Sequence, residues 1–139
     1  MDIYQAVKQL NLMLEGGDQS CDFGCSLETV EHMIDLSKSL CPSKPYCTIK
    51  DWGWVDLDIS ENSRAIYRKN NLFPCFVRTE TIIYDEAKRP HIDTTVRSTA
   101  LLGFHHNCIF ETANTSYILV GTGSRVTINP DIFQYLVER

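Results

Sequence analysis

The sequence of 139 residues has no apolar run that approaches the roughly 18 residues needed to cross a membrane. Its start, MDIYQAVKQL, lacks the basic patch and apolar core of a secretory signal. We therefore expect a cytoplasmic protein with no membrane partner. Basic charge is also scarce, because 13 lysines and arginines face 18 acidic residues and leave a formal net charge of −5. A negative field repels phosphate backbones, so direct nucleic-acid binding is not expected.

Common phosphate-binding and metal-binding spacings are missing as well. The segment 121–124, which ends at Ser124, does not have the G-x-x-x-x-G-K-[ST] spacing of a phosphate-binding loop and is typical of a hairpin turn. Four of the six cysteines have C-x₃-C and C-x₅-C spacings, which fit a tetrahedral zinc ion less well than C-x₂-C. They are Cys21, Cys25, Cys41 and Cys47. A zinc-dependent interaction module built on them is an alternative, and no cofactor is expected.

The sequence also lacks an evident catalytic constellation. His105 and Cys108 are candidates for a nucleophilic dyad, but side chains this close at a hairpin turn seldom face each other. We therefore predict that the protein is not an enzyme, and we assign no catalytic residue. Convergence of cysteine, histidine and acidic side chains in one dry cleft would contradict this prediction.

Two amphipathic helices are predicted at the N-terminus. Apolar residues recur at helical spacing over 2–14 and over 27–40, and Pro42 ends the second helix. A polar loop joins them, so residues 1–42 are expected to form an antiparallel helical hairpin. This hairpin is acidic, because its first 40 residues hold seven acidic and two basic side chains while the rest of the chain holds eleven of each.

Residues 43–139 are expected to be mostly β. Alternating apolar and polar residues predict a strand over 52–58, and aromatic and β-branched residues predict another over 75–84. A short helix is predicted after Ser60, and a C-terminal helix is predicted with Pro130 at its first position. Because consecutive strands have short connections, they are expected to pair as an antiparallel meander.

The predicted fold class is α+β. A single domain over residues 1–139 would combine the N-terminal helical hairpin, a curled antiparallel sheet of five or six strands, and the C-terminal helix. We find no internal repeat and no low-complexity segment that would divide the chain further.

The uneven charge predicts a protein-binding module. Acidic side chains on the hairpin would attract a basic protein surface of a partner complex. The predicted partner-binding residues are Asp18, Asp22, Glu28, Glu31, Asp35, Trp52, Trp54, Asp56 and Asp58. The last four are in phase on one strand, which leaves two interpretations. The tryptophans either form an exposed aromatic patch at a solvent edge or pack in the core, with a bulge separating them from the aspartates.

The C-terminal half carries a motif of the form T-x-N-T-x-Y-x-L-x-G-x-G-x-R. It is made of Thr112, Asn114, Thr115, Tyr117, Leu119, Gly121, Gly123 and Arg125. With the strings around it, this motif resembles a family of small uncharacterised proteins from bacterial phages and prophages. The resemblance implies no reaction and no catalytic residue, but it implies a mobile-element context. Small acidic proteins there often inhibit host defence, as anti-CRISPR proteins do, and this one would occlude a basic nucleic-acid-binding surface.

A second functional class remains open at the level of the sequence. A small enzyme or anion-binding protein could use Arg97 and Arg125 with the backbone of the 121–124 turn to hold an anion. A concave pocket with converging polar groups would favour this class, and a flat sheet face would argue against it.

Overall fold

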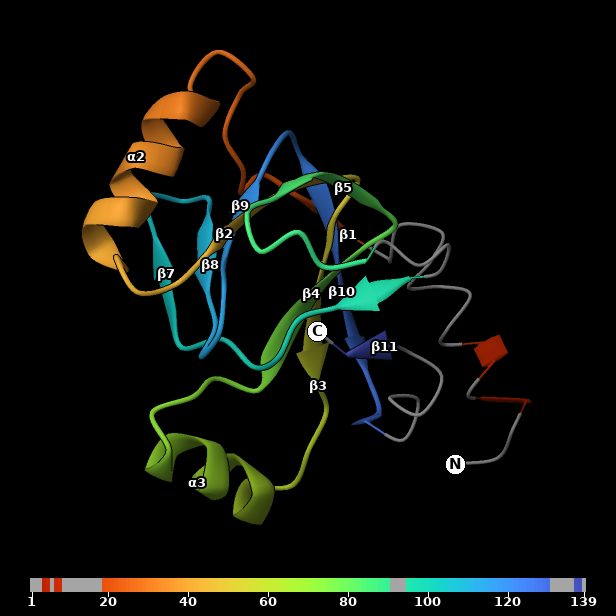
Figure 1. Cartoon of the computed structure of the whole chain (residues 1–139). Coiled ribbons are helices and arrows are strands. Elements are labelled where there is room, and N and C mark those ends of the chain that lie inside the picture. The colour runs from red at the N-terminus through yellow and green to blue at the C-terminus, as the bar shows by residue number, and fades with distance from the viewer. Residues whose placement is uncertain (1–3, 6, 9–18, 91–94, 131–136, 139) are drawn as a thin grey trace.

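The computed structural model describes residues 4–5, 7–8, 19–90, 95–130 and 137–138. Over these residues the protein is mostly β, with two mixed sheets and a small helical part. The expected helical hairpin, single antiparallel sheet and C-terminal helix are therefore wrong as an architecture. Figure 1 shows α2 (Val30–Leu40) near one end of the molecule and α3 (Glu61–Lys69) near the other. No helix in the described part is long and apolar enough to span a membrane.

The strands form two sheets that pack face to face. The first sheet has the order β1 (Gln19–Cys21), β10 (Gly123–Ile128), β3 (Gly53–Leu57), β4 (Cys75–Thr79), β6 (Val96–Arg97) and β11 (Val137–Glu138). The second sheet has the order β5 (Thr81–Asp85), β2 (Tyr46–Lys50), β9 (Ser116–Leu119), β8 (Ile109–Glu111) and β7 (Gly103–His105).

The sheets are mixed because short connections cross from one sheet to the other. The turn at Asp51, whose φ is 51°, leads from β2 in the second sheet to β3 in the first. Glu80 alone separates β4 in the first sheet from β5 in the second, so the predicted strand over 75–84 is two strands. Distant segments then become neighbours: β10 lies parallel to β3, and β2 lies parallel to β9. The period-2 pattern found the strands, but it carries no information about their partners.

The N-terminal segment departs from the predicted hairpin. The predicted helix over 2–14 lies largely outside the described residues, and Asp18 lies outside them entirely. The chain then forms β1, which pairs antiparallel with β10 and buries Cys21. The second predicted helix begins at Val30, because the apolar stripe that packs against β9 starts there and Leu27 is 76 % exposed.

The C-terminal segment also differs from the prediction. Val137 and Glu138 pair in parallel with Val96 and Arg97, so a helix at these two positions is wrong. Residues 131–136 of the predicted helix lie outside the described part of the chain. A short apolar cluster fits a helical or an extended period equally well, and here pairing with the edge of the first sheet decides for a strand. The short helix predicted after Ser60 is confirmed as α3, and the Ser60 hydroxyl accepts a hydrogen bond from the Ser63 N–H.

Both tryptophans lie in the core between the sheets. Trp52 and Trp54 are 1 % and 5 % exposed, so the interpretation as an exposed aromatic patch is wrong. The Trp54 ring meets Phe104 and Phe110 edge-on, with centroids 5.0 Å apart in each case. Asp56 lies on the same face of β3 as Trp54, and no bulge separates them. One end of this strand face is buried in the core and the other end is open to solvent.

Gly123 makes room for the Trp52 indole, and Gly121 accepts its hydrogen bond. A Cβ at Gly123 would lie 2.4 Å from the Trp52 ring, and the Trp52 Nε1 donates to the Gly121 carbonyl at 3.0 Å. Gly121 has a φ of +73°, which favours glycine. The glycine pair of the sequence motif therefore holds a core side chain.

Candidate functional site

A cleft lies on the first sheet beside α3, and we call it the sandwich cleft. It has a volume of ≈ 370 Å³. Its lining residues are Trp54, Asp56, Leu57, Arg64, Phe73, Pro74, Cys75, Leu101, Arg125 and Thr127. The register explains one wall: β10 pairs Arg125 with Trp54 and Thr127 with Asp56, while β4 pairs Cys75 with Asp56. These five side chains therefore share one face of the first sheet.

The sandwich cleft contains a rigid arrangement of one arginine, one aspartate and one tryptophan. Arg125 donates from Nε to Asp56 Oδ2 at 2.6 Å and from Nη2 to Asp56 Oδ1 at 3.2 Å. The Trp54 Nε1 donates to the same Oδ1 at 3.1 Å, and the Arg125 guanidinium lies 5.2 Å from the Trp54 ring centroid. The hydrogen bonds to Asp56 raise the pKa of Arg125 above its usual value. Its Nη1 has no partner among the described residues.

A second guanidinium enters the sandwich cleft from α3. Arg64 donates from Nη2 to the Leu57 carbonyl at 3.3 Å, which leaves its other donors for a ligand. Two arginines against the single carboxylate of Asp56 give the lining a net positive charge. Phe73, which is 56 % exposed, adds an apolar wall. Burial and the charge of Asp56 raise the pKa of the Cys75 thiol to about 12, so this thiol stays protonated and unreactive near neutral pH.

The anion site predicted from Arg97 and Arg125 is not formed. The register aligns Gly53, Arg78 and Arg97 across three strands, whereas Arg125 aligns with Trp54, the next residue along β3. Consecutive strand residues point to opposite faces, so the two arginines lie on opposite sides of the first sheet. The Arg97 guanidinium lies over Phe76 instead, 5.3 Å from the ring centroid.

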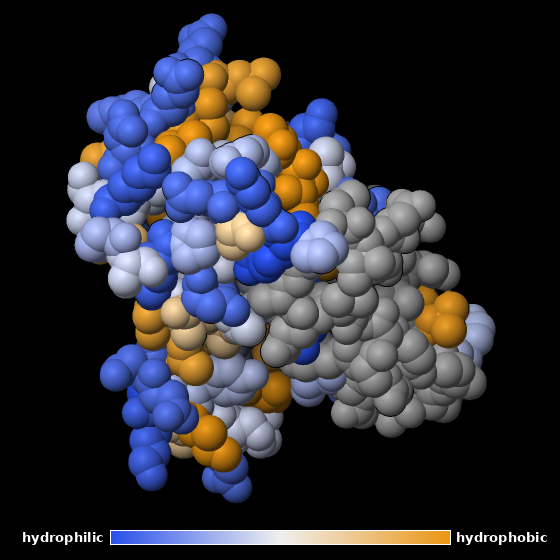
Figure 2. Space-filling view, in the orientation of Figure 1, coloured by the Kyte–Doolittle hydropathy of each residue, from blue (hydrophilic) through white to orange (hydrophobic). Residues whose placement is uncertain are grey.

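Of the predicted partner-binding acids, Glu31 and Asp35 lie on α2, Glu28 lies just before it, and Asp22 follows β1. Asp22, Glu28, Glu31 and Asp35 are all exposed, and none of them forms an ion pair within the described ranges. Figure 2 shows hydrophilic residues gathered over the outer side of this helix. Asp58 is exposed as well, near the opposite end of the molecule. Three other acids, Asp56, Asp85 and Glu111, are paired with bases.

The four-cysteine zinc site is not assembled. Cys21 and Cys47 lie in the core between the sheets, Cys25 lies in the cluster under α2, and Cys41 ends α2. Cys25 also shares a hydrogen bond with Cys108, so the proposed dyad of Cys108 with His105 is not formed either.

A different trio of possible metal ligands does converge. Cys41, His105 and Glu111 place one ligand atom each within 4.8 Å of one another. Sequence reasoning missed this trio, because Cys41 precedes the other two by more than sixty residues and only packing of α2 on the second sheet joins them.

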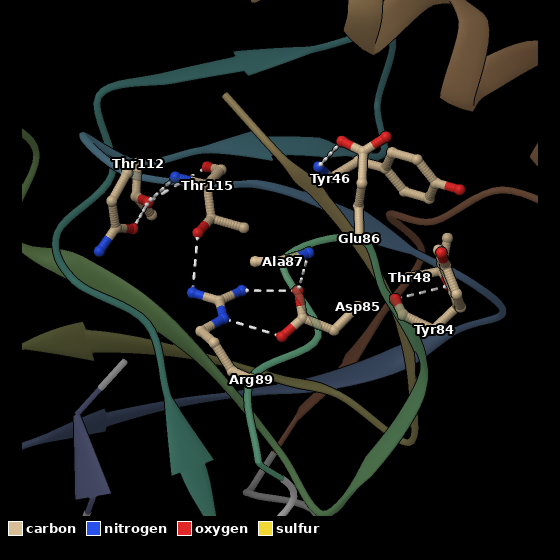
Figure 3. Close-up of polar contacts among 10 residues, drawn as sticks. Tyr46, Thr48, Tyr84, Asp85, Glu86, Ala87, Arg89, Thr112 and Thr115 are labelled. Atoms are coloured by element: carbon tan, nitrogen blue, oxygen red, sulfur yellow. Dashed lines mark hydrogen bonds and ion pairs between the residues drawn. The ribbon is translucent and has the colours of Figure 1, made fainter. Parts of the chain in front are cut away.

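The sequence motif also supports a buried polar network, shown in Figure 3. Arg89 donates from Nε and Nη2 to the two carboxylate oxygens of Asp85, at 2.8 Å and 3.1 Å, and from Nη1 to the Thr115 hydroxyl at 3.1 Å. Thr115 in turn donates its N–H to the Thr112 hydroxyl at 3.1 Å. Both threonines are fully buried, so these motif residues fix the turn between β8 and β9.

The chain belongs to the family described as a domain of unknown function, DUF6957, whose sequence model matches residues 22–134. No curated protein and no solved structure matches the chain. The matched segment contains every residue that lines the sandwich cleft, and it contains Cys41, His105 and Glu111.

Proposed function

We propose that this protein is a non-catalytic binding module whose sandwich cleft receives a carboxylate-bearing segment of a partner protein. The observation that carries the proposal is that two guanidinium groups, Arg64 and Arg125, line one cavity whose lining has a single carboxylate. A guanidinium fork binds carboxylates with two parallel hydrogen bonds, which gives affinity and direction together.

The shape and lining of the sandwich cleft suit one or two side chains of a bound segment. A volume of ≈ 370 Å³ lies at the lower end of the range for small-ligand pockets. The Nη1 of Arg125 and the remaining donors of Arg64 would meet the carboxylate. Phe73 and Leu101 would contact the apolar part of the same segment. The stacking on Trp54 and the bond to Asp56 hold Arg125 in place before the ligand arrives, which lowers the entropic cost of binding.

A matched peptide array tests this proposal. The probes are short peptides in which Glu or Gln follows an aromatic or aliphatic residue, and tryptophan fluorescence reports binding because Trp54 lies beneath Arg125. We expect the Glu peptides to bind and their Gln partners to bind roughly tenfold or more weakly, the usual effect of losing a charged hydrogen bond.

The variants Arg64→Gln and Arg68→Gln form a matched pair for this experiment. Both residues lie on α3, but Arg68 pairs with the exposed Glu61 and does not line the sandwich cleft. We expect Arg64→Gln to weaken binding of the Glu peptides and Arg68→Gln to leave it unchanged. Equal binding of Glu and Gln peptides, or equal effects of the two variants, would contradict the proposal.

The unpaired acids on α2 and in the segment before it support a second candidate function. Asp22, Glu28, Glu31 and Asp35 are not used in the described ion pairs, so their field is available to a basic partner surface. Leu27, 76 % exposed beside them, offers an apolar contact. The resemblance to phage and prophage proteins motivates a host-defence version, in which this acidic surface covers a basic nucleic-acid channel.

Affinity capture from the native host at low salt tests the second candidate. A bound basic protein should be released as salt is raised, because salt screens contacts between exposed charges. The charge-reversed variant Glu31→Lys/Asp35→Lys should lose the partner, and Asp58→Lys serves as the control at the other end of the molecule. Failure to capture any basic protein at low salt would count against this candidate and would leave the peptide result unaffected.

A further inference from the structure

We infer that Cys41, His105 and Glu111 form a binding site for a divalent transition metal, with Zn²⁺ as the preferred ion. Each residue offers one ligand atom, and these three atoms lie within 4.8 Å of one another. A thiolate, an imidazole and a carboxylate are the three kinds of protein ligand that zinc accepts. Open zinc sites have three protein ligands and leave the fourth position for water, and this trio supplies three ligands.

The three ligands are presented by separate, well-packed elements. Cys41 directly follows α2, where its N–H donates to the Ser37 carbonyl at 2.8 Å. His105 ends β7 and Glu111 ends β8, and these strands pair antiparallel. The His105 Nε2 lies 2.9 Å from Glu111 Oε1, so a small separation of these two side chains admits an ion between them. Little of the backbone has to move, because strand pairing and the end of α2 already fix all three positions.

The site is only partly buried, because the His105 side chain is 32 % exposed, so it is not a dry cleft. Cys41 is 6 % exposed, and the Glu111 side chain is 15 % exposed. The Glu111 carboxylate lies against the Lys44 ammonium group and the His105 imidazole, which fix its orientation. Binding a divalent ion would then form a sulfur–metal bond and release the Cys41 thiol proton to solvent, with no change of oxidation state.

Lys44 sets the strength of the proposed site. Its ammonium group pairs with Glu111 Oε2, the carboxylate oxygen that does not face His105. Its positive charge therefore competes for the carboxylate and repels a divalent ion. Replacing Lys44 with the similarly shaped but uncharged Met should tighten metal binding.

The same three residues do not have the geometry of a cysteine nucleophile. A nucleophilic cysteine needs a histidine against its thiol and an acid behind that histidine. Here Glu111 is the common partner, because it meets Lys44, His105 and Cys41. Burial is the main reason that the pKa of the Cys41 thiol is raised, and the Glu111 charge adds to it, so no thiolate nucleophile is prepared.

Titration of the metal-free full-length protein with Co²⁺ tests the inference. Cobalt bound by a thiolate gives a sulfur-to-metal charge-transfer band, and tetrahedral cobalt gives intense visible bands. We expect one Co²⁺ per chain, complete displacement by Zn²⁺, and a rise in the melting temperature with either ion. No charge-transfer band at millimolar Co²⁺ would overturn the inference.

His105→Asn and His106→Asn are the matched variants. His106 is exposed, lies outside the trio, and has a φ of 51° that asparagine tolerates well. We expect His105→Asn to weaken Co²⁺ binding by more than the roughly tenfold to hundredfold seen for changes to outer partners of a metal. His106→Asn should bind like the unaltered protein, and Lys44→Met should bind more tightly. Equal binding by His105→Asn and His106→Asn would overturn the inference, because His105 would then not be a ligand.

X-ray absorption at the zinc edge keeps the test valid even if His105→Asn fails to fold. In the unaltered zinc-loaded protein we expect one sulfur ligand and the remainder nitrogen or oxygen. A shell of several sulfurs, or of oxygen alone, would overturn the inference. The peptide-binding result is independent, because the trio does not line the sandwich cleft.

Discussion

Two arginine–aspartate pairs join elements of this protein that are distant in sequence, and the pairs differ in what surrounds them. In the closed part, Arg89 and Asp85 join the end of β5 to the turn between β8 and β9, and the Asp85 side chain is 7 % exposed. In the sandwich cleft, Arg125 and Asp56 join β10 to β3, and their side chains are 39 % and 29 % exposed. Both arginines donate through Nε and Nη2 to the two oxygens of their partner.

The remaining nitrogen distinguishes the two pairs. The Nη1 of Arg89 donates to Thr115, so all three nitrogens of that guanidinium donate within the protein. The Nη1 of Arg125 faces the sandwich cleft with no partner among the described residues. The same pair of residue types therefore stabilises the fold where it is enclosed and is available for recognition where it is open. The predictions below separate these two roles.

The largest expected effect is loss of the enclosed pair. Arg89→Met leaves the Asp85 carboxylate buried without its counter-charge, which should lower the free energy of unfolding by about 3 kcal/mol. The double variant Arg89→Met/Asp85→Asn should recover most of that loss, because it removes both charges. Urea unfolding measures all three proteins. If the double variant is no more stable than Arg89→Met, the cost does not come from the unpaired charge.

Substitutions at Gly123 and Thr127 compare a tightly packed position and an open position on β10. A Cβ at Gly123 would lie 2.4 Å from the Trp52 ring, so Gly123→Ala should lower the free energy of unfolding by about 2 kcal/mol through overpacking. Thr127 lies four residues further on the same face of β10, where the sandwich cleft is open and its side chain is exposed. Thr127→Ala should cost less than about 0.5 kcal/mol. Thermal melts of the two variants check the difference, and equal melting temperatures would show that Trp52 yields to the added methyl group.

The sequence predicts the local elements of this fold better than their arrangement. The α3 helix was predictable from the Ser60 cap and its polar face, since both signals lie within a few residues. The partner of β3 was not predictable, because β10 lies about seventy residues away and the connections between strands cross from sheet to sheet. Local sequence patterns do not indicate which distant strands pair.

The candidate site was predictable in parts but not as a unit. Trp54, Asp56 and Arg125 each stood out in the sequence, yet the first two suggested a protein interface and the third an anion site. Parallel pairing of β3 with β10 joins them in one cleft. Arg64 and Phe73 were missed, because an arginine on a polar helix and a phenylalanine in a loop have no distinguishing pattern.

The buried pair of Asp85 and Arg89 should make the free energy of unfolding depend on pH. Burial alone would raise the pKa of Asp85, but the hydrogen bonds and charge of Arg89 outweigh it and lower that pKa. The unfolded value is about 3.9, so the pair contributes its stability above that pH and loses it as pH falls through the lower folded pKa. The urea midpoint should therefore drop more steeply below about pH 4 in the unaltered protein than in Arg89→Met/Asp85→Asn. Parallel curves for the two proteins would assign the acid sensitivity to other carboxyl groups.

The smallest expected effect on stability is at the exposed pair of Arg125 and Asp56. Its variants test whether this pair binds a ligand. Arg125→Gln should lower the free energy of unfolding by about 1 kcal/mol or less, because solvent reaches both side chains and screens their attraction. The same variant should lose binding of the Glu peptides by roughly tenfold or more, since the ligand's charged hydrogen bonds are gone. Urea unfolding and tryptophan fluorescence give the two numbers on one sample. A loss of stability as large as that of Arg89→Met, with peptide binding intact, would make Arg125 a second structural arginine and would remove the physical basis for a ligand in the sandwich cleft.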